Sequence, residues 1–166
     1  MHTLTRLGIC AATLTAAVSP AAIFSIANAS AETRVALDSN IRRCDFSLVS
    51  TAPWVPKSGL GSGSANIRSS GTAAVAEVHM TVTDEPGGHF DVGLIQEPLP
   101  SSATCGPGDP ATAFTGMDVD GAGNGTATVH AKLRQGTTGV WVVVERANPN
   151  SQNPAEFYTS EFVVPT

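Results

Sequence analysis

Three histidines lie after residue 31, and they are the side chains best suited to chemistry. His79 follows Glu77 by two residues, and His130 lies in a separate segment with a similar polar and apolar alternation. Imidazole and carboxylate groups that converge from two strands can bind a metal or act as an acid and a base. The resulting hypothesis is a weak metal-binding or enzymatic site formed by His79, Glu77 and His130. The competing interpretation is that they are solvated groups on polar strand faces.

A second candidate is the glycine-rich stretch MDVDGAGNGTATVH, residues 117–130. A calcium loop of the EF-hand type needs oxygen ligands at its first, third, fifth and twelfth positions. Two aspartates suit the first and third positions, but Ala122 and Val129 occupy the fifth and twelfth. Glycine and asparagine favour turns. The stretch is therefore predicted to be a hairpin that joins residues 113–118 to a strand at 126–134.

Other catalytic signatures are absent from the sequence. It contains no Gly-x-Ser-x-Gly nucleophile motif, no Cys-x-x-Cys pair, and no Lys-Ser/Thr after the glycines of residues 59–63. The net charge is −5, and the densest basic spot is the pair Arg42 and Arg43. A protein that binds nucleic acid needs a broader basic surface than this pair of arginines. We therefore expect a non-enzymatic protein that has no cofactor and does not bind nucleic acid.

Residues 1–31 have the anatomy of a secretory signal peptide. An arginine near the start precedes an apolar run that Pro20 interrupts, and two overlapping Ala-x-Ala motifs predict cleavage after Ala31 or after Ala29. No later apolar run reaches the about 20 residues of a membrane span. We therefore predict a single domain at residues 32–166 that is secreted, extracellular or in the cell envelope, with no membrane span after cleavage.

The predicted cleavage also determines which cysteines remain. Cys10 leaves with the signal peptide, so Cys44 and Cys105 stay in the chain. An even number of cysteines in an exported protein indicates a disulfide. We predict a Cys44–Cys105 bridge.

The elements that must position these groups are strands, because apolar and polar residues alternate with a period of two. The strands predicted from alternation or from short apolar runs are residues 74–83, 90–95, 126–134, 140–144 and 157–164. Cys44, Phe46 and Leu48 are also predicted to share one face near the start of the domain. The stretch GLGSGS at residues 59–64 is predicted to be a long surface loop. Short strands separated by turn clusters indicate an all-β fold, an antiparallel β-sandwich of the immunoglobulin or a similar Greek-key type.

A binding role would be served by an exposed aromatic surface. Trp54 lies in a predicted loop between Pro53 and Pro56. Trp141 either points outward from its strand or lies in the core, which is the more frequent environment of tryptophan. Trp54 and Trp141 are the candidate binding surface. The expected function is that of a binding or interaction module, whose partner is an unknown protein or a ligand of the envelope or cell surface.

Residues 89–164 contain, in order, HFDVGLI, a cysteine in a loop, DVDGAGNGTATVHAKL and GVWVVVER. This arrangement resembles small secreted β-sandwich proteins of actinobacteria, mycobacteria among them, and more faintly the extracellular CHRD-type modules. The resemblance implies a strand that leads to a cysteine loop, a D-x-x-G-x-G turn and two long strands. It implies no particular activity and no site residues.

Overall fold

The computed structural model describes residues 31–49, 59–151 and 153–166, and its regular elements there are β-strands. They are β1 (Glu32–Asp38), β2 (Ser62–Ser70), β3 (Ala73–Thr81), β4 (His89–Glu97), β5 (Thr112–Asp118), β6 (Asn124–Lys132), β7 (Gly139–Arg146), β8 (Glu156–Ser160) and β9 (Val164–Pro165). The predicted all-β fold is confirmed. Residues 1–30 of the predicted signal peptide and Trp54 lie outside the described residues.

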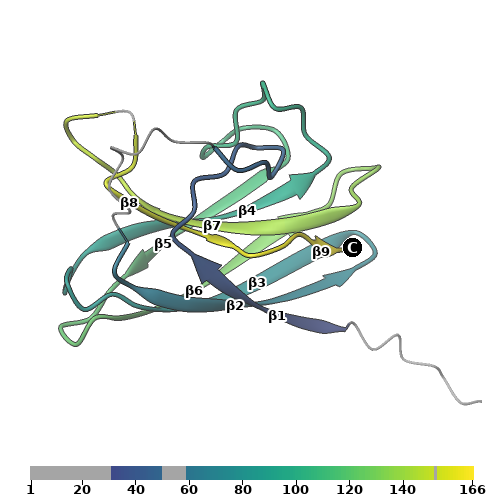
Figure 1. Cartoon of the computed structure of the whole chain (residues 1–166). Helices are drawn as coiled ribbons and strands as arrows, with labels where there is room; N and C mark the ends of the chain where they lie inside the picture. The colour runs from purple at the N-terminus through teal and green to yellow at the C-terminus, as the bar shows by residue number, and fades with distance from the viewer. Residues whose placement is uncertain (1–30, 50–58, 152) are drawn as a thin grey trace, which may run out of the picture.

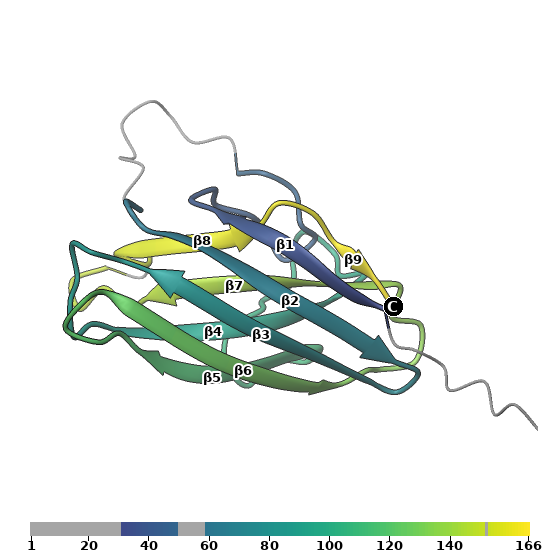
Figure 2. The ribbon, with the colours of Figure 1, turned by 90° about the horizontal axis from the view of Figure 1, so that it is seen from below.

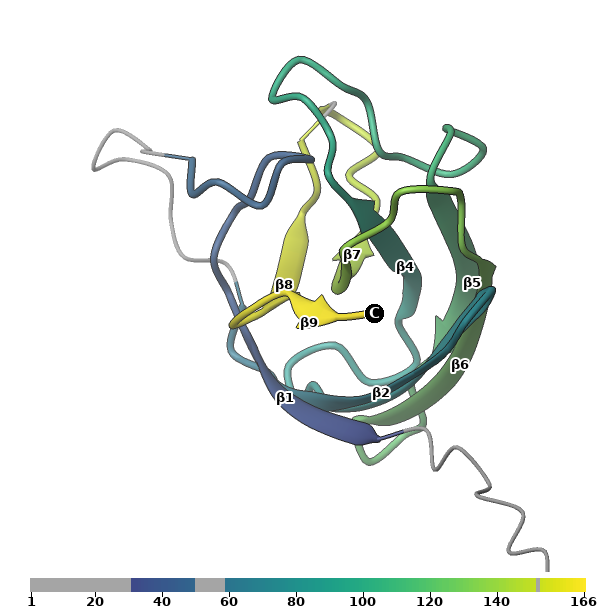
Figure 3. The same cartoon turned by 90° about the vertical axis from the view of Figure 1, so that its right-hand side faces the viewer.

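One antiparallel sheet contains all nine strands. Eight follow the order β5-β4-β7-β8-β1-β2-β3-β6, and β9 pairs with β7. Figure 3 shows these strands arranged as a ring, with β9 across its opening. At the two ends of the sheet, β5 and β6 are joined only by an isolated bridge between Val119 and Gly125. The sheet is therefore curled into a barrel-like shape that is nearly closed, and this single sheet supplies both layers of the predicted antiparallel fold (Figure 1).

The core lies between these two layers and follows the alternation of the strands. Every second residue of β3, from Ala74 to Met80, is at most 3% exposed. The inward residues of β4 and β7 face them from the other layer and include Phe90 and Val142, both fully buried. Burial of such side chains contributes about 25 cal/mol per Å² of apolar surface. The predicted inward faces at 74–83, 90–95 and 126–134 are confirmed.

β2 corrects the predicted loop at residues 59–64, because Ser62–Ser64 are part of this strand. β2 pairs with β1 on one side and with β3 on the other, and this pairing overrides the weak strand propensity of glycine and serine. Gly63 is required by packing. A Cβ there would lie 2.6 Å from the His79 carbonyl oxygen and would overlap the Met80 side chain.

The predicted strand face at Cys44, Phe46 and Leu48 is wrong. Residues 41–49 form a loop outside the barrel, held by an isolated bridge between Arg42 and Leu48. Phe46 has a φ of 62°, a left-handed conformation that is rare for a bulky residue. This reversal lets the Phe46 ring pack against Trp141, with ring centroids 5.5 Å apart.

The predicted closing strand at residues 157–164 is divided into two. β8 pairs with β7 and with the end of β1. After residues 161–163, β9 pairs with the opposite end of β7, where Val164 lies across from Val140. The chain therefore uses its last residues to cover one opening of the barrel (Figure 3).

Near the opposite end of β7, the core contains an ionisable side chain. Glu156 is 1% exposed and accepts a hydrogen bond from the Tyr158 hydroxyl. Its other oxygen lies 3.5 Å from Nε of Arg146, which also binds Glu85. Burial raises the pKa of the Glu156 carboxyl, whereas the hydroxyl bond acts in the opposite direction. The Tyr158 hydroxyl also accepts the Gly61 N–H at 2.8 Å, so it is a partner for the buried Glu156 carboxylate and for a partly buried N–H group.

Replacing Tyr158 with phenylalanine is expected to lower the free energy of unfolding by about 1–3 kcal/mol. The ring would remain, but the Glu156 carboxyl and the Gly61 N–H would each lose a partner inside the protein. Denaturant unfolding checks this value. Thr83→Val, which removes an exposed hydroxyl, is the matched control and should change stability by less than about 0.5 kcal/mol. Equal stability of the two variants would contradict the assigned role of the hydroxyl.

Candidate functional site

The outward face of β1, β2, β3 and β6 carries the predicted histidine candidates, and Figure 2 shows how these four strands lie side by side. β3 pairs along its full length with β2 and with β6. In this register His79 lies between Ser64 and Thr126, and Glu77 lies between Asn66 and Thr128. Aligned residues of neighbouring strands therefore place hydroxyl, amide and charged side chains next to one another across this face.

His79 and Glu77 are brought together as predicted from their spacing. Nε2 of His79 lies 3.1 Å from Oε1 of Glu77. Nδ1 of His79 lies 3.3 Å from Oγ1 of Thr126 on the neighbouring strand. Both ring nitrogens thus have a partner, which orients the imidazole on the sheet. The sequence did not identify Thr126, because the contact depends on the register between β3 and β6.

His130 does not join this pair, although β3 and β6 are neighbours as expected. It lies opposite Val75, four residues along β3 from His79, which corresponds to about 13 Å along a strand. Among residues 31–49, 59–151 and 153–166, no three His, Cys, Asp or Glu side chains form a group that could hold a metal ion. The structure therefore brings together two of the three residues of the metal hypothesis and separates the third.

A hollow of about 420 Å³ opens on this face beside His79. The four strands β1, β2, β3 and β6 all contribute to its lining. The lining residues are Arg34, Ser62, Gly63, Ser64, His79, Met80, Thr81, Asn124, Gly125 and Thr126. Most of these side chains can donate or accept hydrogen bonds. The hollow is thus a polar site built from side chains that are far apart in the sequence.

The glycine-rich stretch that resembled a calcium loop forms a turn. Oδ1 of Asp120 accepts the N–H groups of Ala122 and Asn124, each at 2.8 Å. These bonds lower the pKa of the Asp120 carboxyl. The predicted turn is confirmed and joins the two predicted segments, but β5 and β6 meet in one isolated bridge, Val119–Gly125, and not in a fully paired hairpin, while β6 pairs with β3 and β5 pairs with β4. The turn connects the two layers of the barrel instead.

His89 forms a second polar cluster, on the outer face of β4 and β5. Its Nδ1 lies 2.6 Å from Asp118, and its Nε2 lies 4.0 Å from Asp91. The hydrogen bond to Asp118 raises the pKa of the His89 imidazole, and the charges of both aspartates act in the same direction. The ring lies over Gly116, where a Cβ would be 2.7 Å from the imidazole. The cluster ties the edge strand β5 to β4.

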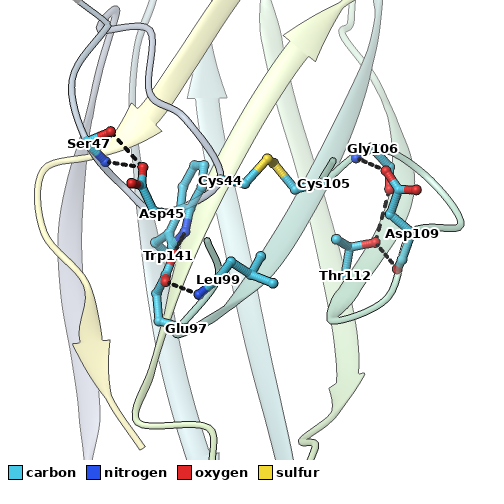
Figure 4. Close-up of a disulfide and its surroundings, with 10 residues drawn as sticks. All are labelled: Cys44, Asp45, Ser47, Glu97, Leu99, Cys105, Gly106, Asp109, Thr112 and Trp141. Carbon is cyan, nitrogen blue, oxygen red and sulfur yellow. Dashed lines mark hydrogen bonds between the residues drawn. A yellow bond between two sulfur atoms is a disulfide. The ribbon is translucent and has the colours of Figure 1, made fainter. Parts of the chain in front are cut away.

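The prediction that Trp141 forms part of an exposed binding surface is wrong. It points away from the barrel core, as one of the two alternatives held, yet it is only 2% exposed. The Phe46 ring covers it, and its Nε1 donates to Oε1 of Glu97 at 2.8 Å. The predicted Cys44–Cys105 disulfide is confirmed and lies beside the indole (Figure 4). Trp141 therefore belongs to a small second core outside the barrel.

The described residues leave few large apolar side chains exposed. They are Leu48, Leu60 and Phe162. Trp54, the other tryptophan of the predicted binding surface, lies outside the described residues. The hollow beside His79 is consequently the candidate site that the described residues support best.

Comparison of the chain with protein families, with curated proteins and with solved structures found no match. In the part of the chain that the structure describes, no helix has the length and apolar character needed to cross a membrane.

Proposed function

We propose that this protein is an exported, non-enzymatic binding module that recognises a hydrophilic, hydroxyl-bearing ligand, such as a saccharide, on the outer face of β1, β2, β3 and β6. The observation that carries the proposal is the hollow beside His79, whose polar side chains come from four adjacent strands. Hydrogen-bonding groups fixed on a paired sheet are preorganised, so little conformational entropy is lost when a ligand binds. The predicted signal peptide and the Cys44–Cys105 bridge support export.

The same residues also suggest a catalytic alternative that the local backbone disfavours. Glu77, His79 and Thr126 follow the order carboxylate, imidazole and hydroxyl that activates a nucleophile in hydrolases. Acyl transfer also needs free N–H donors to stabilise the developing oxyanion. β2 and β3, which form the middle of the hollow, are paired on both sides, so their N–H groups are used within the sheet. β6, which carries Thr126, pairs with β3, so its unpaired N–H groups lie on the edge away from His79. This arrangement favours binding over catalysis.

His79→Ala is expected to weaken binding of a hydroxyl-rich ligand about tenfold. The imidazole orients the Thr126 hydroxyl in the hollow, and a ligand hydrogen bond lost when that hydroxyl is released costs about 1–1.5 kcal/mol. The measurement is an NMR titration of the secreted, disulfide-bonded protein. Its two probes are a neutral galactose trisaccharide and the corresponding galacturonate trisaccharide. Saturable shifts should concentrate at Ser64, His79 and Thr126, the residues of one row across the sheet.

The matched control for this experiment is His130→Ala. His130 is an exposed histidine on the same face, but it lies outside the hollow. This variant should bind both probes as the wild type does. If neither trisaccharide causes saturable shifts, or if the two histidine variants bind equally, the proposed binding function is wrong.

A further inference from the structure

We infer that the ligand of this hollow is anionic as well as hydroxyl-rich, namely an acidic saccharide whose carboxylate binds Arg34. The inference rests on the proposed function and names the class of ligand that the site would take. It follows from the distribution of charge around the hollow and from the distance between its two sides.

The charge of the lining is opposite in sign to that of the whole chain. The protein has a net charge of −5, yet no aspartate or glutamate is among the residues that line the hollow. The lining contains one arginine, Arg34, and one imidazole, that of His79. Arg34 thus places a positive charge in a hollow of an acidic protein, and this charge favours an anionic ligand.

Arg34 is exposed, and no ion pair within the described parts of the chain includes it. Its neighbour Arg68 on the same face pairs with Glu32. Across the sheet from Arg34 lies Asn66, and only beyond it comes Glu77. Two strand spacings of about 4.8 Å therefore separate the backbone positions of Arg34 and Glu77, and Glu77 is itself in contact with His79. The guanidinium remains able to bind a carboxylate in a bidentate manner.

The width of the hollow argues against a small inorganic anion. Arg34 lies on β1 and Thr126 on β6, with β2 and β3 between them. Arg34 is aligned with Thr128, two residues from Thr126, so three strand spacings and this offset place the backbones of Arg34 and Thr126 about 16 Å apart. An anion held by Arg34 alone would leave the hydroxyl and amide groups of β3 and β6 without a ligand partner. A ligand with a carboxylate at one end and several hydroxyl groups along its length would contact both sides. An acidic oligosaccharide has this chemistry.

The test compares the galacturonate trisaccharide with the neutral galactose trisaccharide, using isothermal titration calorimetry on the secreted protein. The wild type should bind the acidic probe about tenfold more tightly, and the preference should decrease as salt screens the charge. Arg34→Gln should abolish the preference, so that the two probes bind with equal affinity. Arg68→Gln, which removes an ion-paired arginine on the same face, should retain the preference.

The possible results separate this inference from the function on which it depends. Equal affinity for both trisaccharides, or a preference that survives Arg34→Gln, would overturn the anionic assignment and leave saccharide binding intact. Inorganic phosphate or sulfate that binds as tightly as the acidic trisaccharide would replace the saccharide with a simple anion. No binding of either trisaccharide would overturn both proposals.

Discussion

Replacing Trp141 with alanine is expected to lower the free energy of unfolding by about 3–5 kcal/mol, the usual cost of truncating a large buried aromatic residue. The indole is covered by Phe46 and lies on the outer face beside Ile95, its fully buried partner on β4. Truncation would open a cavity there. It would also remove the donor that binds Glu97 at 2.8 Å, which adds the cost of a partly buried carboxylate that has lost a hydrogen bond.

Urea denaturation followed by far-UV circular dichroism measures this loss, because the signal comes mainly from the peptide groups and remains available when the indole is removed. Trp141→Phe is the informative control. It keeps an aromatic ring under Phe46 and loses the indole N–H, so it should be destabilised by less than the alanine variant. A loss below about 1 kcal/mol for Trp141→Ala would show that the second core contributes little to stability.

Removing the disulfide is the second large change. Cys44→Ala with Cys105→Ala is expected to lower the free energy of unfolding by about 2–4 kcal/mol, because the bridge restricts the unfolded chain across a sequence separation of 61 residues. The bridge also joins two loops that lie outside the barrel (Figure 4). Its loss frees the loop that carries Phe46, so the cover over Trp141 should loosen as well.

The reference for the disulfide prediction is the wild-type protein under reducing conditions, which should match the double alanine variant within about 1 kcal/mol. The variant itself should be insensitive to reductant. Because Cys44 and Phe46 belong to one loop, the effects of losing the disulfide and of Trp141→Ala should not be additive. Full additivity would contradict the view that the bridge and the indole stabilise one common structure.

The strands that alternate cleanly were predictable from the sequence, because one of their faces is buried and the other is not. β3 and β6 show this pattern, and the inward residues Val78 and Val129 are at most 2% exposed. The disulfide was predictable for a simpler reason, since only Cys44 and Cys105 remain after the predicted signal peptide. Local patterns of this kind do not depend on which strands become neighbours.

β1 and β2 were missed for the opposite reason. The β2 sequence SGSANIRSS is poor in β-branched and aromatic residues, and its strand conformation depends on pairing with β1 and β3. At the loop that contains Phe46, the opposite error occurred, because a strand was predicted where the structure has none. Its alternating apolar residues suggest a strand, whereas the left-handed conformation of Phe46 comes from packing against Trp141, which is distant in sequence.

The candidate site was only half predictable because it depends on register. The pair Glu77 and His79 follows from their spacing on one strand. Arg34 and Ser64 lie on strands that the sequence did not reveal, and Thr126 reaches His79 only because β3 pairs with β6. No residue spacing within a single segment could have indicated that these side chains line one hollow.

The place of β1 in the sheet determines when the chain can fold. β1 is the first strand of the described chain, yet the end of this strand pairs with β8, where Leu37 lies opposite Ser160. A chain that is still emerging from a ribosome or a translocation channel lacks β8, so the two layers cannot yet be joined through β1. Joining of the two layers through β1 therefore waits until β8 has been synthesised.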